Sequence, residues 1–433
     1  MASRAWSIAT RLCHPTSTKV DGYGAMSTPI FQTATFAQPT ATTFGEYDYS
    51  RSGNPTRTVL EEQMAALDGA DRSFAFASGM AAISTLVRLV PSGGRIVTGD
   101  DIYGGTSRLL GKIAPRLGIS VEHVDMCDLD NVRAALSRAG TKTDLVILET
   151  PTNPRLRITD LAGVAAAARA CGAICAVDNS VMAPVLQLPL QHGADIVMTS
   201  ATKFIAGHSD TTGGILSVRG KELVEQIAFI QNAEGSALGP FDCWLCLRGL
   251  KTMALRMERQ QRNAWRLAEF LSRHPLVTRV NYPGLAAHPG HALHMAQAAG
   301  PGSIVSFETG SVDASKAIVE AANLFSVTVS FGSTNSLISL PCFMSHASIP
   351  ADVRAARGLP DDLVRISAGI EDADDLIADL GAALDAASGG GAAHAAEAAE
   401  AALAAEELDK AALVARIKQL EGELAESRKT REN

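Results

Sequence analysis

The stretch DIVMTSATKFIAGHSD (residues 195–210) combines a short apolar run with a lysine just beyond its carboxyl end. The run DIVMTS has the length and composition of a buried strand, and Lys203 follows it. Five similar runs precede it and alternate with helical patterns: RSFAFAS (72–78), RIVTGD (95–100), SVEHVD (120–125), DLVILET (144–150) and AICAVD (173–178). Strands that alternate with helices in this way predict a mostly parallel sheet with helices on both faces.

Length and composition divide the chain into four parts. With 433 residues and 46% hydrophobic content, the chain is long enough for two globular domains. We expect an α/β fold, in which a large domain is followed by a smaller C-terminal α+β domain that opens with a long helix from about residue 250 to 274. The expected parts are an N-terminal arm (1–50), the large domain (51–249), the small domain (250–387) and a Gly/Ala-rich linker with a helical tail (388–433).

The tail begins with SGGG (388–391), which is typical of a flexible linker. Beyond it, four apolar residues recur at heptad spacing, namely Leu413, Ile417, Leu420 and Leu424. The pattern lasts for about two heptads, fewer than a coiled coil needs. A solvated helix of high alanine propensity and a short interaction helix therefore both remain open.

Charge, hydropathy and cysteine usage argue against several classes of protein. The net charge of -8 without a basic stripe argues against a nucleic-acid partner. No run approaches the roughly 20 apolar residues that cross a bilayer, so we expect no membrane association.

Seven cysteines do not form a disulfide framework in so long a chain, and neither Cys171 and Cys175 nor Cys243 and Cys246 have the context of a zinc site. The HxxHxxH pattern (288–294) drifts off one helical face, so we expect no metal there either.

Three polar groups follow strands of the expected sheet, at the edge where open parallel sheets bind ligands. Lys203 could form a Schiff base with a cofactor whose phosphate binds nearby, or it could be a surface charge. Asp178 could pair with a buried cationic nitrogen, or it could cap a helix. Ser78 and Gly79 could open a helix that binds phosphate, or form an ordinary turn. Each feature alone is weak, but their order on successive strands favours one shared site.

The full set of motifs resembles the Cys/Met-metabolism group of pyridoxal-5′-phosphate (PLP) enzymes, which have the fold-type I transferase architecture. The resemblance extends from about residue 25 to 384 and rests on YDYSRSGNPTR (47–57), SGMAA (78–82), DDIYGGT (100–106), ETPTNP (149–154), VDNS (177–180), SATKFIAGHSD (200–210) and LVRISAGIEDADDLIADL (363–380). Within the group, PFDCWLCLRGLKTMALR (240–256) and SLISLPCFMSHASIPADVRAARGL (336–359) are similar to the plant-type cystathionine β-lyases.

The resemblance implies a role for each residue around the cofactor. Lys203 would be the Schiff-base lysine, Asp178 would pair with the pyridinium nitrogen, and Tyr103 would stack on the ring. The phosphate would be held by a cup of backbone amides and hydroxyls, namely Gly79, Met80, Ser200 and Thr202.

The resemblance also assigns the substrate contacts and a shared site. Arg365 would clamp the substrate carboxylate as an additional catalytic group, with Asn153 near the cofactor O3′ and the carboxylate, and Ser330 would position Lys203. Tyr49 and Arg51 would reach into the site of a neighbouring subunit. The implied assembly is a homo-oligomer, a tetramer built as a dimer of active dimers.

The implied activity is β-elimination of L-cystathionine to homocysteine, pyruvate and ammonia in methionine biosynthesis. A cystathionine γ-synthase or γ-lyase is the alternative, although Asn335 stands where γ-enzymes commonly carry Glu. An adaptor that works through the helical tail is the non-enzymatic alternative. The opening MASRAWSIATRLC (1–13) has two arginines and no acid, as short transit peptides do, so we expect a chloroplast or other plastid location, with the cytoplasm as the alternative.

Overall fold

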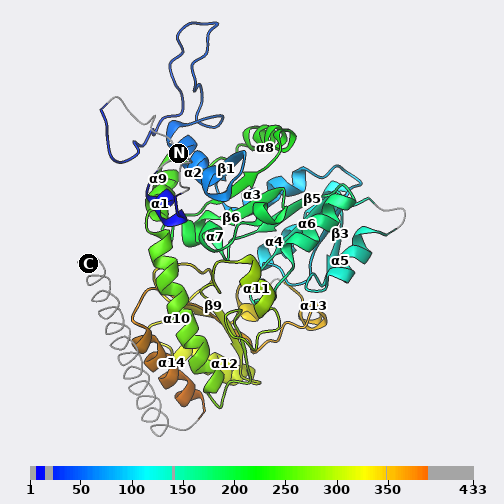
Figure 1. Cartoon of the computed structure of the whole chain (residues 1–433), viewed down its shortest axis with the longest axis vertical. Coiled ribbons are helices and arrows are strands. Elements are labelled where there is room, and N and C mark those ends of the chain that lie inside the picture. Colours follow the sequence, from blue (N-terminus) through cyan, green and yellow to red (C-terminus); the bar gives the residue numbers. More distant parts are fainter. Residues whose placement is uncertain (1–5, 15–22, 139–141, 348, 389–433) are drawn as a thin grey trace, which may run out of the picture.

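The computed structural model describes residues 6–14, 23–138, 142–347 and 349–388 (Figure 1). Within these ranges, seven strands form a sheet in the order β1-β7-β6-β5-β4-β2-β3. The strands are β1 (Arg72–Phe76), β2 (Arg95–Gly99), β3 (Ser120–Val124), β4 (Leu145–Glu149), β5 (Ile174–Asp178), β6 (Ile196–Ser200) and β7 (Gly214–Val218). Strand β7 runs antiparallel to both neighbours, β1 and β6, and the other pairings are parallel. The mostly parallel sheet is confirmed, whereas β7 was not anticipated.

Helices cover both faces of this sheet because alternate strand residues point to opposite sides. Phe74 and Phe76 belong to a core shared with helices α3, α4 and α8, whereas Ala75 between them packs into the core of α2 and α9. The helices up to this point of the chain are α1 (Ile8–Cys13), α2 (Pro55–Asp68), α3 (Gly79–Arg88), α4 (Gly104–Lys112), α5 (Leu129–Leu136), α6 (Leu161–Ala170), α7 (Ala183–Leu186), α8 (Lys221–Glu234) and α9 (Pro240–Leu250), with short 3₁₀ turns at Ala114–Leu117 and Pro189–His192.

Local sequence signals fix the helix ends that matter for the site. The Asn54 side chain caps α2 and Pro55 occupies its first position, while Gly69 ends it in the left-handed region at φ 70°. The Ser78 side chain accepts a hydrogen bond from Ala81 N at 3.0 Å and thereby caps α3. The end of β1 is therefore converted directly into a helix start at the sheet edge.

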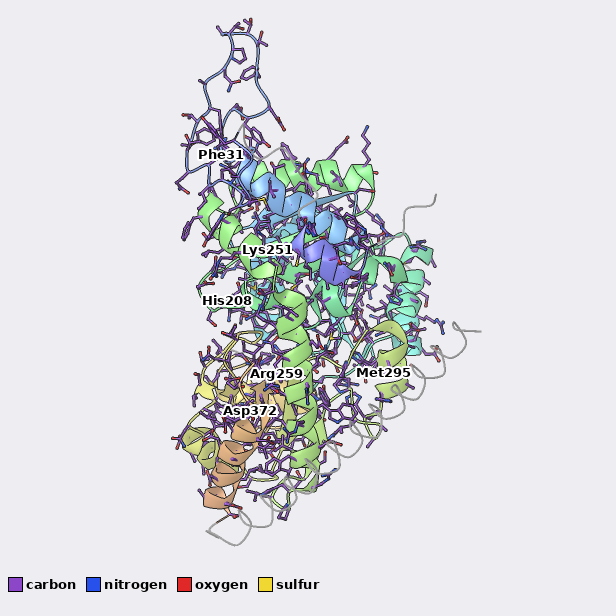
Figure 2. The ribbon with its side chains drawn as sticks, turned by 60° about the vertical axis from the view of Figure 1, so that its left-hand side comes forward. Phe31, His208, Lys251, Arg259, Met295 and Asp372 are labelled. Carbon is purple, nitrogen blue, oxygen red and sulfur yellow. The ribbon has the colours of Figure 1, made fainter. Side chains whose placement is uncertain are left out.

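A second sheet lies in the C-terminal part of the chain, in the order β10-β11-β12-β9-β8. Its elements are β8 (Arg279–Asn281), β9 (Ile304–Glu308), β10 (Ser326–Val327), β11 (Leu337–Ser339) and β12 (Val364–Ser367), with α10 (Met253–Arg273), α11 (His291–Gln297), α12 (Val312–Ala321), α13 (Ala351–Ala356), α14 (Ala373–Ala387) and a 3₁₀ turn at Pro341–Phe343. The long helix expected near residues 250–274 is α10. Figure 2 shows Arg259 of α10 beside Asp372, which caps α14, and their ion pair spans 3.3 Å.

Residues 28–45 form no helix and no strand beyond an isolated bridge between Thr35 and Tyr49. Helix α1 was not expected, and its Leu12 is buried against the large core. Residues 1–5 and 389–433 lie outside the described residues, so the start of the proposed transit peptide and the heptad pattern of the tail fall there. The four-part division of the chain stays a prediction. No helix in the described ranges is long and apolar enough to cross a membrane.

Candidate active site

The carboxyl ends of β4, β5 and β6 border a cavity of about 200 Å³. Most of the residues proposed from the sequence line it, namely Gly79, Met80, Tyr103, Asn153, Asp178, Ser200, Thr202 and Lys203. Residues from five strand-to-helix connections and from the second sheet's loops therefore meet at one edge, as the topology of an open sheet requires.

Lys203 lies in a π-helical turn, Ala201–Ile205, and its own backbone leaves helical geometry (φ -84°, ψ -123°). Its Nζ donates a hydrogen bond to Ser330 Oγ at 2.6 Å and lies 4.7 Å from the centre of the Phe331 ring. Burial, and then the nearby Arg365 guanidinium, lower the pKa of Lys203 to about 8, against the opposing field of Asp178. Such an amine is neutral far more often near pH 7 than an ordinary lysine, which suits a nucleophile.

The backbone of Ser330 is held at φ 88°, a left-handed conformation that is costly for a residue with a side chain. Its Oγ accepts the Lys203 hydrogen bond and its carbonyl oxygen accepts one from Arg365 Nη2 at 2.7 Å. Ser330 thus joins the amine to the guanidinium, and its role as a positioning group for Lys203 fits this geometry.

Two carboxyls, Asp178 and Glu149, face the cavity from neighbouring strands, where they are register partners. Asp178 accepts a hydrogen bond from Ser180 N at 2.9 Å. Loss of hydration raises the pKa of Asp178, although Ser180 and Lys203 oppose this. Burial and then repulsion from Asp178 raise the pKa of Glu149 well above its ordinary value. A cationic ring nitrogen in the cavity would supply the partner that this acidic pair lacks.

The start of α3 and the turn after β6 give the cavity a closely packed set of hydrogen-bond donors, called the cup below. Helix α3 begins at Gly79, so its first N–H groups lie at the cavity wall. A Cβ atom at Gly79 would lie 3.3 Å from Ser200 Oγ, and one at Gly214 would lie 2.5 Å from Ser78 O. The Thr202 hydroxyl accepts a hydrogen bond from Gly213 N at 3.0 Å. Amide and hydroxyl donors at such close quarters suit a phosphate group.

Arg365 is 2% exposed and has no ion-pair partner among the residues that the structure describes. Its Nη1 donates to Asn153 Oδ1 at 3.0 Å, while its Nε is buried without a hydrogen-bond partner in those same residues. Burial lowers the pKa of Arg365 to about 10. A buried guanidinium with an unused donor is an appropriate binding group for a carboxylate.

Tyr103 lies at the cavity and is 37% exposed, and a Cβ atom at Gly105 would approach its ring to 2.4 Å. Tyr49 and Arg51 do not line the cavity of their own chain. Tyr49 is 42% exposed, and Arg51 lies 5.2 Å over its ring and donates to Asn232 Oδ1 at 3.2 Å. An exposed aromatic and cation on an extended arm are compatible with contact to another subunit.

A family model described as "Cys/Met metabolism PLP-dependent enzyme" matches residues 9–385. The chain belongs to this family. Its fold is the α/β fold-type I architecture of these enzymes, and the family's cofactor is pyridoxal 5′-phosphate. The resemblance inferred from the motifs is therefore confirmed.

Individual relatives agree with this assignment. The chain is 60% identical over 84% of its length to "Cystathionine beta-lyase, chloroplastic" from Arabidopsis thaliana, covering 77% of that protein. It is 46% identical over 89% of its length to "Cystathionine beta-lyase MetC" from Bacillus subtilis, covering 98% of that protein. A solved structure of cystathionine gamma synthase from Xanthomonas oryzae pv. oryzae, in complex with cystathionine, superposes with a TM-score of 0.86 at 40% identity, covering 89% of this chain and 99% of that one.

The residues present fit the family's cofactor. The amine, the acidic pair and the donor cup all line one cavity, and Gly214 packs so closely against Ser78 and Gly79 that a methyl group there would clash with the start of α3. Lys203 would hold the aldehyde carbon, Asp178 the ring nitrogen, and the cup with Ser200 and Thr202 the phosphate.

Sequence reasoning gave no role to two groups that the structure places at the site. Glu149 belongs to the quoted motif ETPTNP, and Arg256 belongs to PFDCWLCLRGLKTMALR. Arg256 Nη2 donates to the carbonyl oxygens of Phe204 and Gly249 at 2.8 Å and so holds the turn that follows Lys203. The sequence signals that could have identified them were an acid at the end of a strand, for Glu149, and an arginine within a quoted motif, for Arg256.

Within the described residues, the histidines of the HxxHxxH pattern and the cysteines do not line the cavity. His291 Nδ1 lies 2.8 Å from Pro283 O and His294 Nε2 lies 3.0 Å from Gly300 O, so both bind backbone. Burial lowers the pKa of His294 to about 4. In the described ranges the cysteines are free thiols, and no group of three His, Cys, Asp or Glu side chains could hold a metal ion.

Proposed function

We propose that this chain is a PLP-dependent carbon–sulfur lyase that cleaves L-cystathionine by β-elimination, giving homocysteine, pyruvate and ammonia in methionine biosynthesis. The observation that carries the proposal is a cavity lined by a lysine of lowered pKa and an acidic pair, with the buried Arg365 guanidinium hydrogen-bonded to Asn153 of the same lining. The cystathionine β-lyases among its relatives support this choice within the family.

Pyridoxal phosphate, when bound, draws electrons away from the substrate's α-carbon and so makes the hydrogen on that carbon acidic. Lys203 is the proposed acid–base group, which takes the proton from the α-carbon and delivers one to the leaving sulfur. Ser330 Oγ, 2.6 Å from Nζ, keeps the amine on the cavity side of the turn. Asp178 holds the ring nitrogen in its protonated form through its carboxylate.

Orientation of the substrate falls to Arg365 and Asn153. The guanidinium is already fixed by two hydrogen bonds, to Asn153 Oδ1 and Ser330 O, and keeps its Nε for the α-carboxylate. A clamp at the carboxylate would fix the orientation of the α-carbon relative to Lys203, and a fixed orientation favours proton removal. The buried walls around Lys203 limit the access of water to the reacting atoms.

The product pair formed from L-cystathionine tests the reaction. Homocysteine with pyruvate is the expected result. Cysteine with 2-oxobutyrate would replace the proposal by a γ-lyase, and turnover only with an activated homoserine and cysteine would replace it by a γ-synthase. Deleting residues 388–433 should leave specific activity little changed, and a large loss would favour a functional role for the tail.

We also propose that two subunits share each active site, through Tyr49 and Arg51 of the arm. Both are exposed here and lie outside the cavity of their own chain. Mixing refolded Lys203→Ala and Arg51→Ala chains tests this. In a hybrid dimer one site would carry both changes and the other neither, so activity should reappear; no recovery in verified hybrids would refute sharing.

A plastid location is proposed from the acid-free opening (1–13) and from the chloroplastic description of the Arabidopsis relative. Incubation of the radiolabelled full-length chain with isolated chloroplasts should give a protease-protected product. A chain that stays protease-sensitive would favour the cytoplasm.

A further inference from the structure

Glu149 stands at the carboxyl end of β4, is 7% exposed and lines the same cavity as Lys203. No role was assigned to it from the motifs, although burying a carboxyl so deeply is costly unless it binds something. Its surroundings show what it binds.

The Glu149 carboxylate connects two segments that carry site residues. Its Oε2 accepts a hydrogen bond from Tyr103 N at 3.0 Å. The N–H of Asn153 also stabilises its charged form. Tyr103 precedes α4, whereas Asn153 follows β4, so one carboxyl holds the backbone of both segments at the cavity.

The side chains of these two residues do different work. Tyr103 is the proposed stacking partner of the cofactor ring, and Asn153 orients Arg365 through the 3.0 Å hydrogen bond from Nη1. A shift of either backbone would therefore tilt the ring or the carboxylate clamp. The packing leaves little freedom elsewhere, because a Cβ atom at Gly104 would lie 2.3 Å from Ser345 O.

We propose that Glu149 is a positioning residue that sets the angle between the cofactor ring and the substrate's carboxylate by holding Tyr103 and Asn153 together. The inference rests on the proposed function for the identity of the substrate. The placement of Tyr103 against the bound cofactor can be tested without any substrate. Asp178, the register partner of Glu149, contacts the ring nitrogen directly in the proposed function and is not replaced by Glu149.

Glu149→Gln and Glu149→Asp test the proposal in the PLP-bound enzyme. Glutamine keeps the size of the side chain but removes its charge and replaces one acceptor oxygen with a donor, which weakens its hold on the two amides. Aspartate keeps the charge but is one methylene shorter. Each variant should reduce kcat/KM by about 10-fold to 100-fold, the range for losing one hydrogen bond to a charged group.

Visible-region circular dichroism of bound PLP is the second readout, because its amplitude depends on the fixed contact with Tyr103 and needs no substrate. The matched control is Glu122→Gln on β3, whose carboxylate binds Arg95 and Arg138 away from the cavity. The control should lower the unfolding temperature while leaving the dichroism band and kcat/KM unchanged.

A changed band in both Glu149 variants, with unfolding temperatures no lower than that of the control, supports the proposal. A wild-type band and wild-type kcat/KM in a folded Glu149→Gln protein would overturn it. If that variant fails to fold, the band of Glu149→Asp decides in the same way. Failure of the proposed function would appear instead in the products of the unmodified enzyme, and the dichroism comparison would still stand.

Discussion

Gly214→Ala is expected to weaken cofactor binding while leaving the sheet intact. Gly214 begins β7, between Phe76 of β1 and Ser200 of β6. A Cβ atom there would lie 2.5 Å from Ser78 O and 2.7 Å from Gly79 Cα, where ordinary contacts start at 3.4 Å. The start of α3 must therefore retreat by about 0.7–0.9 Å, the differences between these distances.

The magnitude follows from the cost of overpacking, which is about 1–3 kcal/mol for one extra methyl group in a well-packed site. The start of α3 can relax away from the added methyl group when no phosphate is bound. If phosphate binding then forces it back, the overpacking energy reduces the free energy of PLP binding. The Kd for PLP should then rise by roughly 5-fold to 150-fold. Fluorescence titration of the cofactor-free protein with PLP measures it directly.

Gly111→Ala is the control, because this glycine lies in α4 with open space around the position of a Cβ atom. That change should leave the Kd unaltered and raise stability by about 0.5–1 kcal/mol. A Gly214→Ala protein that binds PLP as tightly as the unmodified chain would refute the assignment of the start of α3, Gly79 and Met80, to the phosphate cup.

Further outcomes follow from the same geometry. Lys203→Ala should abolish turnover and the visible absorbance of the lysine–cofactor adduct; full activity in this variant would contradict the assignment. The pKa of Lys203 is lowered to about 8, so PLP should rebind covalently to the cofactor-free protein at a rate that rises with pH through about 8 and then levels off. Stopped-flow absorbance measures this rate. A rise that continues to about pH 10 would mean an unperturbed amine. Arg365→Lys should raise KM for cystathionine by about 10-fold or more in steady-state assays. A single ammonium cannot replace the forked guanidinium that binds both Asn153 and Ser330. An unchanged KM would argue against Arg365 as the group that binds the substrate's carboxylate. Arg256→Lys should lower the free energy of unfolding by about 1–3 kcal/mol in thermal melts, because one of the carbonyl groups of Phe204 and Gly249 loses its donor. An unchanged melting curve would mean that other contacts hold the turn after Lys203.

The sequence predicted the sheet well where the local pattern and the global topology agree. Six apolar runs bounded by turns became β1 to β6, because fully buried parallel strands need such runs. Strand β7, GILSV, was missed because it follows the Lys203 turn without an intervening helix and so breaks the alternation. Helix α1 was missed because six residues carry little periodicity, and its place is decided by the burial of Leu12.

The site could be predicted as far as its motifs follow strands. Lys203, Asp178 and Gly79 meet because parallel strands bring their carboxyl ends to one edge. The hydrogen bonds from Lys203 to Ser330 and from Tyr103 to Glu149 could not be derived from spacing, because each joins segments far apart in the chain.

Lys203 follows β6 of the first sheet, but its amine contacts Ser330 and Phe331, which follow β10 of the second. If the two sheets hinge apart, the amine will meet water and its pKa will return toward that of a free lysine. The packing of the second sheet's loop against this amine therefore decides how readily the lysine loses its proton, so the two halves of the chain share control of the nucleophile.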